Sequence, residues 1–164
     1  MDGPVSATPE ARLAAAGLPL PASPMPRGAY APWHAVSLGD AVMVHVSGQT
    51  CRVNGVAMQG VCKGPEDVPP AREAAQIAML NCLAALRGAA GELADVLRLV
   101  RVRGFIRTEG SFESHPSVLD AATELLQMAF PSLPLPARSA VGVTSLPDNA
   151  WIEIELEALV RRRV

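Results

Sequence analysis

Two runs near the C-terminal end of the chain alternate apolar and polar residues with the period of two that is typical of β-strands. In the run 137–143 the valines alternate with Arg138, Ala140 and Gly142. In the run 151–158 aliphatic residues alternate with a row of carboxylates, which are Glu153, Glu155 and Glu157. If the two strands are neighbours in one sheet, Arg138 and the glutamates share one face. We expect the function of the protein on this face.

The same kind of pattern predicts the other elements. Strands are expected over 34–38, 41–47 and 96–108, because apolar positions recur there at every second residue. Helices are expected over 68–88 and 117–130, where strong helix formers and apolar stripes follow a proline. The order strand, strand, helix, strand, helix, strand, strand predicts an α+β domain, with a mixed β-sheet and two helices packed on one face.

The N-terminal part of the chain reads differently. Residues 8–18 predict a short helix capped by Thr8, which we expect to be an appendage rather than part of the core. Four prolines between 19 and 26 predict an extended connector. We therefore divide the chain into an N-terminal extension, residues 1–26, and a main domain, residues 27–164.

The strand predicted over 96–108 places Arg101 and Arg103 on one side, together with Leu99 and Phe105. Arginines cannot line a dry core unless carboxylates pair with them. Glu155 and Glu157 can therefore have either of two roles, in a site or in neutralising these arginines across strands. A half-apolar, half-charged face also favours packing against other copies of the chain, so we expect a closed homo-oligomer.

Composition limits the possible functions. The 164 residues carry a net charge of −2 and 4% aromatic residues, which disfavours a nucleic-acid-binding face. No apolar stretch is long enough to cross a membrane, and no secretory signal is recognisable, which favours the cytoplasm. The three cysteines and three histidines do not fall into ligand spacing, so we expect no metal site.

Several polar residues have structural interpretations as well as functional ones. Asn81 lies in a nearly all-apolar helix and is expected to hydrogen-bond a loop. Tyr30, the only tyrosine, can be a packing ring, and Thr123 can be an ordinary helical threonine. His45 on a strand is expected to be structural.

Taken together, three motifs resemble the RidA/YjgF family, the reactive imine deaminases. They are Ser47-Gly48-Gln49 after a strand, the alanine-rich helix with Asn81, and the closing Ala137-Arg138-Ser139, Leu146-Pro147 and Ile152-Glu153-Ile154-Glu155. The resemblance runs from about Tyr30 to the C-terminus.

The resemblance implies a fold like that of the Bacillus-type chorismate mutase, in a homotrimer whose sheets form an inner barrel with ligand clefts between subunits. It implies hydrolysis of 2-imino acids, such as 2-iminopropanoate and 2-iminobutanoate, to 2-keto acids and ammonia. It implies no metal and no organic cofactor, and the expected partners are a small carboxylate substrate and two further copies of the chain, not nucleic acid or membrane.

Residue by residue, the resemblance implies that Arg138 binds the substrate carboxylate and that Glu153 positions a water molecule. It implies that Tyr30 places its ring near the ligand, that the backbone of Gly48 lines the cleft, and that Thr123 lies beside the ligand. An arginine suits a carboxylate because its fork of donors binds both oxygens and stays charged.

The sequence also departs from the family pattern. Ala140 stands where many members have a cysteine, and the N-terminal extension resembles a longer branch labelled endoribonuclease. Two alternatives to the deaminase therefore remain, a non-enzymatic trimer that binds small carboxylates and an endoribonuclease. The sequence offers no paired catalytic histidines for the latter.

Overall fold

The computed structural model describes residues 7–163, so that residues 1–6 of the predicted N-terminal extension lie outside it. One sheet has the strand order β1-β2-β7-β5-β6. Its strands are β1 Trp33–Leu38, β2 Ala41–Thr50, β5 Val96–Arg107, β6 Ala137–Val143 and β7 Ile152–Arg161. Only the β5–β6 pair is parallel within this sheet. The predicted α+β organisation with a mixed sheet is confirmed.

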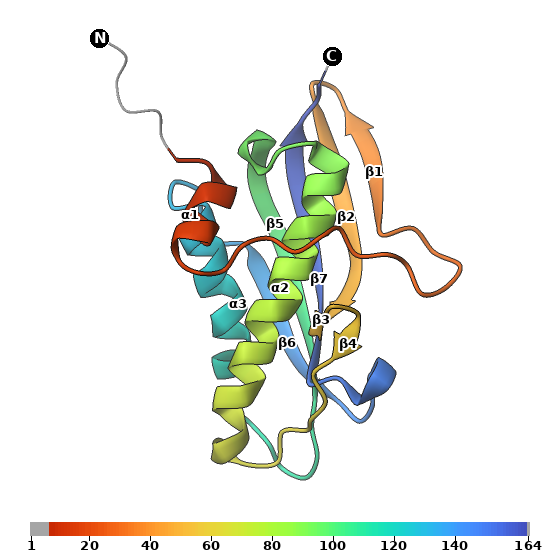
Figure 1. Cartoon of the computed structure of the whole chain (residues 1–164), viewed down its shortest axis with the longest axis vertical. Coiled ribbons are helices and arrows are strands. Elements are labelled where there is room, and N and C mark those ends of the chain that lie inside the picture. The colour runs from red at the N-terminus through yellow and green to blue at the C-terminus, as the bar shows by residue number, and fades with distance from the viewer. Residues whose placement is uncertain (1–6, 164) are drawn as a thin grey trace.

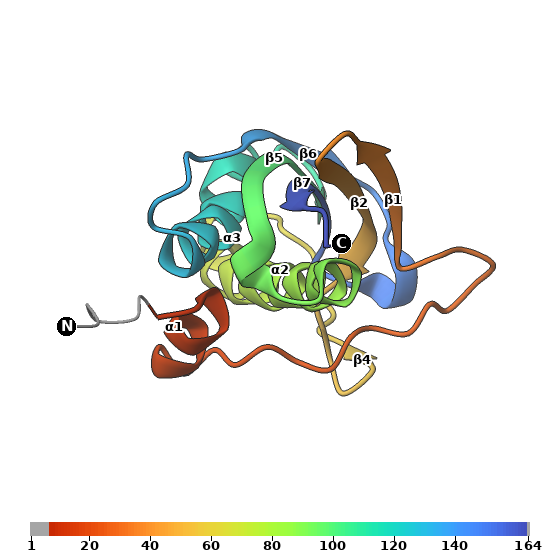
Figure 2. The same cartoon turned by 90° about the horizontal axis from the view of Figure 1, so that it is seen from above.

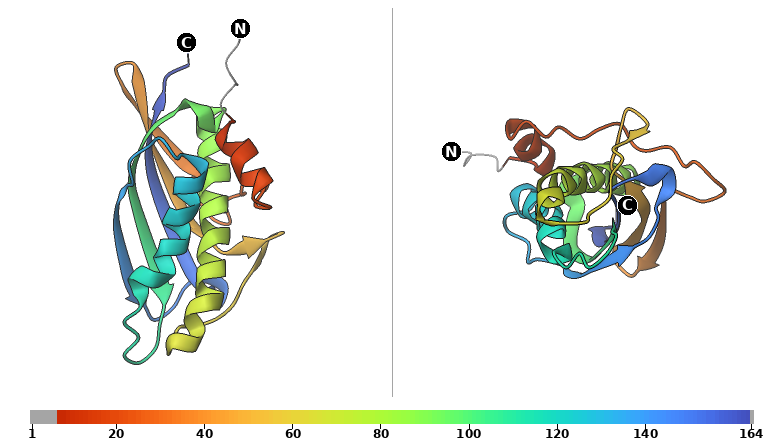
Figure 3. Two further views of the ribbon diagram at one scale, coloured as in Figure 1. Left: turned by 90° about the vertical axis from the view of Figure 1, so that its left-hand side faces the viewer. Right: turned by 90° about the horizontal axis from the view of Figure 1, so that it is seen from below.

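Two helices, α2 Val68–Ala90 and α3 His115–Ala129, pack side by side on one face of the sheet (Figures 1 and 3). The core lies between them and the sheet. Its sheet side includes fully buried residues from the three central strands: Val44, Val102, Ile106, Ile152, Ile154, Leu156 and Ala158. The helices therefore leave the opposite face of the sheet open in the single chain.

Asn81 ties α2 to the end of β2. Its Nδ2 donates to the carbonyl oxygens of Thr50 and Arg52, at 3.0 and 3.1 Å. The expected structural hydrogen bond is confirmed, but its acceptors are the last residue of β2 and the first residue of the next strand rather than a loop. The chain then forms a small hairpin of β3 Arg52–Val53 and β4 Val56–Ala57. Asn54 and Gly55 make its turn with φ of 51° and 82°, the left-handed conformation that these two residues favour.

The N-terminal helix α1, Pro9–Ala15, is capped by Thr8 as predicted, through a hydrogen bond from Ala11 N to Thr8 Oγ1. It is not an appendage, because Leu13 is fully buried in the main core. Glu10 accepts a hydrogen bond from Leu93 N at 2.9 Å, and Arg12 donates to Ala129 O at 2.9 Å. Seen from above, α1 lies on the outer side of α2 and α3 (Figure 2). Among residues 7–163, no helix has the length and apolarity needed to span a membrane.

The two C-terminal strands are not neighbours, and the expected shared face is wrong. β5 lies between β6 and β7, and Arg138 pairs with Val102, which pairs with the buried Leu156. Paired residues point to the same face, so Arg138 faces the helices while the glutamates of β7 face away. The physical reason is the connection: β6 runs parallel to β5 and is reached through the crossover helix α3, not by a hairpin with β7.

The β5 strand contains a second departure from simple alternation. A register shift between Leu99 and Arg101 in the pairing with β7 turns Leu99 to the helix-covered side, where it is buried. The prediction that Leu99 shares a face with Arg101 is therefore wrong. A bulge changes which side of a strand the following residues occupy, and no alternating pattern reveals it in advance.

Candidate functional site

The structure separates the five predicted site residues into two groups. Arg138 on β6 and Thr123 on α3 lie together on the helix-covered side. Gly48 on β2 and Glu153 on β7 lie together on the open side, and Tyr30 lies nearby, beside Ser47 and Glu155. Because the two groups face opposite sides of one sheet, a single chain does not bring all five residues into one cavity.

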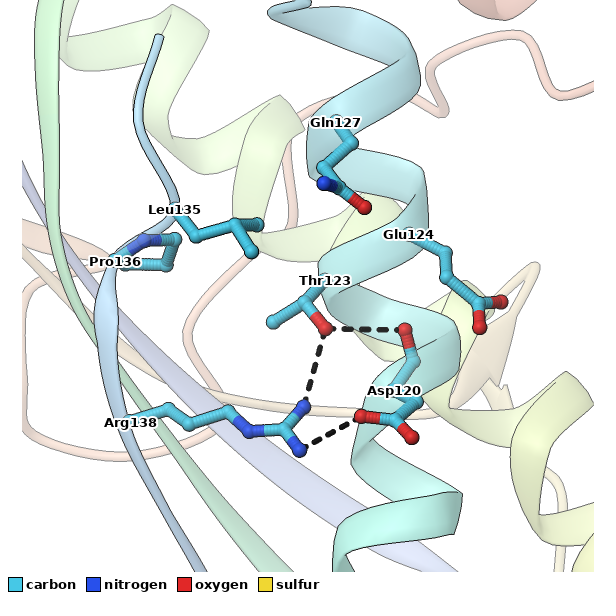
Figure 4. A pocket seen from close by; sticks show the side chains of 7 residues that line it. All are labelled: Asp120, Thr123, Glu124, Gln127, Leu135, Pro136 and Arg138. Atoms are coloured by element: carbon cyan, nitrogen blue, oxygen red, sulfur yellow. Dashed lines mark hydrogen bonds and ion pairs between the residues drawn. The ribbon is translucent and has the colours of Figure 1, made fainter.

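Arg138 lines a pocket of about 410 Å³ between α3 and the chain entering β6 (Figure 4). We call it the arginine pocket, and its lining residues are Asp120, Thr123, Glu124, Gln127, Leu135, Pro136 and Arg138. An arginine is tolerated on the helix-covered side because β6 is an edge strand, and its side chain keeps 27% of its surface exposed. The pocket opens to solvent and presents one cationic group.

Thr123 and Asp120 hold the guanidinium in place. Arg138 Nη1 donates to Thr123 Oγ1 at 3.1 Å, and the Thr123 hydroxyl donates to the Asp120 carbonyl oxygen at 3.1 Å. Since its hydrogen is committed to that carbonyl, the threonine oxygen faces the arginine as an acceptor. Arg138 Nη2 pairs with Asp120 Oδ1 at 2.7 Å, and Pro116 O lies 3.5 Å from the same nitrogen. The arginine is therefore oriented before any ligand arrives.

Asp120 is a pocket residue that the sequence reasoning missed. It lies three positions before Thr123 on α3, and residues with that spacing share a helix face. Once Thr123 is considered as a ligand neighbour, this spacing would have pointed to Asp120 as well. Glu124 also lines the pocket, but its Oε2 pairs with Arg72 Nη2 at 2.7 Å, and Figure 4 shows it directed away from Arg138.

On the open side, Glu153 lies directly over the backbone of Gly48. A Cβ atom at position 48 would stand 2.1 Å from Glu153 Oε1, so only glycine lets the carboxylate occupy this place. The β2–β7 pairing shifts register between Val46 and Gln49, and this bulge presents the backbone of Ser47 and Gly48 to β7. Because Gly48 has no side chain, it leaves the space that the Glu153 carboxylate occupies.

The Glu153 carboxylate makes no hydrogen bond or ion pair with any other residue in the range 7–163. Partial burial raises the pKa of this carboxyl above its ordinary value, and the negative charge of Glu155 raises the pKa further. The positive charge of Arg52 partly offsets both effects. Glu153 is therefore a half-buried acid with free oxygens and an increased affinity for a proton.

Tyr30 lies in the segment that leads into β1, and this segment is held on both sides of the tyrosine. Arg27 pairs with Asp148 at 2.9 Å on one side of the tyrosine. On the other side Ser47 N donates to Pro32 O at 3.0 Å, and Ser47 Oγ donates to Ala31 O at 2.6 Å. The ring is 51% exposed and borders a pocket of about 460 Å³ on the open side of the sheet.

The other two glutamates of β7 have a structural partner. Arg103 Nη1 pairs with Glu155 Oε2 at 2.7 Å, and Arg103 Nη2 with Glu157 Oε1 at 3.0 Å. Their expected role in neutralising Arg103 is confirmed, whereas the exposed Arg101 forms no ion pair with the residues that the structure describes. His45 Nδ1 lies 3.5 Å from Glu157 Oε1. Because Arg103 pairs with both Glu155 and Glu157, Glu153 is the one unpaired carboxylate of the three on this strand.

No cluster of three or more His, Cys, Asp or Glu side chains within residues 7–163 is arranged to hold a metal ion. What the two groups offer is an oriented cation in a pocket and an unpaired carboxylate beside a glycine backbone. The first can bind an anion with planar geometry. The second can orient a water molecule and accept its proton.

The chain is similar to proteins of a known family. Residues 10–156 match the family described as "YjgF/chorismate mutase-like, putative endoribonuclease". The chain is 35% identical over 138 residues to the 2-iminobutanoate/2-iminopropanoate deaminase of Dermatophagoides farinae, covering 82% of this chain and 88% of that protein.

Solved structures give the same result. A crystal structure from Shewanella oneidensis, described as a putative endoribonuclease, has a TM-score of 0.82 at 31% identity, covering 93% of this chain and 99% of that one. The YjgF gene product of E. coli has a TM-score of 0.55 at 28% identity, covering 86% and 94% of the two chains. The chain belongs to the RidA/YjgF family.

Proposed function

We propose that this protein hydrolyses 2-imino acids of the iminopropanoate and iminobutanoate class to 2-keto acids and ammonium. The observation that carries the proposal is Arg138, a guanidinium oriented by Thr123 in a solvent-open pocket of about 410 Å³. A guanidinium held in this way is a ready partner for a carboxylate. The 35% identity to a protein named 2-iminobutanoate/2-iminopropanoate deaminase supports the same substrate class.

The complete site needs a second copy of the chain. In one chain Arg138 and Glu153 face opposite sides of the sheet, so a site that uses both must form between copies. We therefore propose a homotrimer with its sites between subunits. Apolar side chains on the open face support contact with another copy, because Val36, Leu38 and Val141 are each more than 40% exposed there.

In the proposed reaction the substrate carboxylate binds Arg138, whose guanidinium is oriented by Thr123, and the imine carbon comes to lie near a water molecule held by Glu153. The water oxygen bonds to the imine carbon as the C=N π electrons move to nitrogen, and Glu153 accepts a proton from the water. Glu153 then returns that proton to the nitrogen, and the C–N bond breaks to release ammonia. The hydroxyl oxygen forms the carbonyl as its proton passes to Glu153, and ammonia takes up this proton to leave as ammonium, which restores the Glu153 carboxylate. The balance is one protonated imine and one water giving one keto group and one ammonium ion.

The properties of Glu153 support this role. A general base is most effective when its pKa is close to the working pH, and burial together with Glu155 raises the pKa of this carboxyl. Its oxygens make no hydrogen bond or ion pair within the described chain that a water molecule would have to displace. The protonated imine is already electrophilic, so orientation and one placed water are sufficient chemistry.

The test is the hydrolysis of 2-iminopropanoate generated in situ by an amino-acid oxidase acting on alanine. Arg138→Ala should lower kcat/KM by about 100-fold or more, because a charged, bidentate contact is lost. Arg138→Lys keeps the charge without the fork and should recover only part of the loss. Arg98→Ala removes an exposed arginine whose side chain hydrogen-bonds, among residues 7–163, only to the carbonyl oxygen of Leu97, and it serves as the matched control. Wild-type protein that leaves the imine decay rate unchanged would refute the proposed function.

A further inference from the structure

The arginine pocket already contains a carboxylate. Asp120 Oδ1 lies 2.7 Å from Nη2 of Arg138, and Thr123 Oγ1 lies 3.1 Å from Nη1. A guanidinium binds a carboxylate with two parallel hydrogen bonds along one of two edges, Nη1 with Nη2 or Nε with Nη2. Both edges include Nη2, which has two hydrogens, so a bidentate ligand carboxylate on Arg138 shares this nitrogen with Asp120 and lies next to it.

This contact has an electrostatic consequence. A ligand that carries only a carboxylate brings its negative charge next to that of Asp120, and the two repel each other across the same guanidinium. A ligand with a positive charge next to its carboxylate avoids this repulsion, because its cation can face Asp120 while its carboxylate faces Arg138. The pair Arg138–Asp120 is thus complementary to a zwitterion whose cationic nitrogen is bonded to the carbon next to its carboxylate.

We propose that Asp120 is a specificity-determining residue, which binds the cationic nitrogen of a protonated 2-imino acid, or of a 2-amino acid, while Arg138 binds the carboxylate. The proposal rests on the proposed function, in that it takes Arg138 as the carboxylate-binding group. It goes further by naming the ligand's protonation state and by explaining product release. Hydrolysis replaces the cationic nitrogen by a neutral keto oxygen, so the product loses its attraction to Asp120. Its carboxylate is still held by Arg138 but is now repelled by Asp120 without compensation.

Glu124 provides a matched control from the same helix. It lines the same pocket and carries the same charge as Asp120, but its carboxylate pairs with Arg72 and points away from Arg138. Glu124→Gln therefore removes one negative charge from the pocket without touching the guanidinium. Any effect of Asp120→Asn that Glu124→Gln does not reproduce comes from the contact with Arg138, not from the overall charge of the pocket.

The experiment measures the dissociation constants of alanine and pyruvate for the full chain by titration calorimetry. These two ligands share a carbon skeleton and a carboxylate, and they differ in the charge at the second carbon. Asp120→Asn should weaken alanine binding and tighten pyruvate binding, so that the ratio of the two constants shifts by about tenfold toward pyruvate. Glu124→Gln should leave the ratio within about twofold of wild type. Asp120→Glu keeps the charge and should keep most of the preference for alanine.

Thermal melts establish that each variant is folded, and Asp120→Ser replaces Asp120→Asn if the latter is not. Equal changes in both constants, or wild-type protein that binds neither ligand, would overturn the inference. The outcome also separates this inference from the proposed reaction. If Asp120→Asn shifts the binding ratio but the wild-type protein does not hydrolyse the imine, Asp120 determines specificity and the deaminase proposal is wrong. If the protein hydrolyses the imine but Asp120→Asn does not shift the ratio, the deaminase proposal holds and the role of Asp120 is wrong.

Discussion

Arg138 and Glu153 are the two residues to which we attribute the chemistry, and their surroundings differ in every respect. Arg138 faces the helices and is held by Thr123 and Asp120. Glu153 faces the open side of the sheet and makes no hydrogen bond or ion pair in the part of the chain that the structure describes. A binding group benefits from being fixed in advance, whereas a proton acceptor must keep its oxygens free.

The local structure explains the difference. β6 passes alongside α3, so an arginine on this edge strand reaches the side chains and carbonyls of the helix. Glu153 lies on a central strand, where backbone donors are used by neighbouring strands, and it rests on Gly48, which offers no side chain. The glutamates further along β7 receive Arg103 instead. Arg138 is thus oriented by Thr123 and Asp120. Glu153 has no such partner in the described chain, so its oxygens stay free to bind a water molecule and a proton.

The comparison predicts different kinetic losses at the two positions. Glu153→Gln keeps the shape of the side chain and removes its basicity, so kcat for imine hydrolysis should fall by about 100-fold or more with little change in KM. Arg138→Ala should instead raise KM as well, because it removes substrate binding. Steady-state kinetics on the same in situ imine separates the two patterns.

Glu157→Gln is the control for that measurement, since it removes a carboxylate from the same strand and face that is already paired with Arg103. Its kcat should stay within about twofold of wild type. If Glu153→Gln retains full kcat, Glu153 is not the base. Full activity in cells would then favour the non-enzymatic carboxylate-binding trimer, which requires Arg138 but not Glu153.

A second prediction follows from the opposite orientation of the two groups. If each site combines Arg138 of one copy with Glu153 of another, subunits with Arg138→Ala and subunits with Glu153→Gln should complement each other. In a randomly mixed oligomer about a quarter of the sites would carry both native side chains. Activity should therefore rise from about one hundredth to about one quarter of wild type after the two variants are unfolded together and refolded.

The control for complementation is the same pair of variants mixed without unfolding, which should stay inactive for as long as subunits do not exchange. A double variant, Arg138→Ala with Glu153→Gln, refolded with wild type gives the reference for hybrid oligomers. If the refolded mixture remains as inactive as its components, the two residues do not act in one shared site, and the arrangement between copies is wrong.

The elements of the fold could be predicted from the sequence because the signals were local. Alternation located β5 and β7, and helix formers following proline located α2 and α3, all within a few residues of their observed ends. A structural hydrogen bond from Asn81 could also be predicted, because a buried side-chain amide needs a hydrogen-bond partner. The pairing of Arg103 with Glu155 followed from the shared face of their strands.

The site could not be assembled from the sequence for a topological reason. Alternation says which residues of one strand share a face, but not which face, nor which strand is the neighbour. β5 separates β6 from β7, and this order placed Arg138 on the opposite side from Glu153. Leu13 was misjudged for a related reason, since a seven-residue helix shows no sign of the groove that buries its one leucine.

A third prediction tests whether Gly48 acts through Glu153. In Gly48→Ala the new methyl group would overlap the carboxylate, and the flexible end of Glu153 would move aside. Stability should fall by less than about 1 kcal/mol, while kcat should fall about tenfold because the base is displaced from its water. In the Glu153→Gln background the same change should cost little further activity, since the two effects are not independent. Equal losses in both backgrounds would show that Gly48 acts in another way.

The smallest predicted effect concerns stability and pH. Burial and the charge of Glu155 raise the pKa of Glu153 in the folded protein, so the folded state binds this proton more tightly than the unfolded state. The ionised carboxyl therefore destabilises the fold at pH values above the raised pKa. This penalty disappears as the pH falls through the folded pKa toward the ordinary value.

Glu153→Gln removes that penalty and should be more stable than wild type at about pH 8, by less than the roughly 1.4 kcal/mol that one full pKa unit represents, because the group is partly solvated. The advantage should shrink as the pH is lowered to about 4. Glu155→Gln removes one of the two causes of the raised pKa of Glu153. In a Glu155→Gln protein, Glu153→Gln should therefore add less stability than it does in wild type. The acid limb of the kcat profile of Glu155→Gln should also move to lower pH. Denaturant unfolding across this pH range measures wild type, the two single variants and the double variant, and a stability difference between wild type and Glu153→Gln that is constant with pH would contradict the assignment of a raised pKa to Glu153.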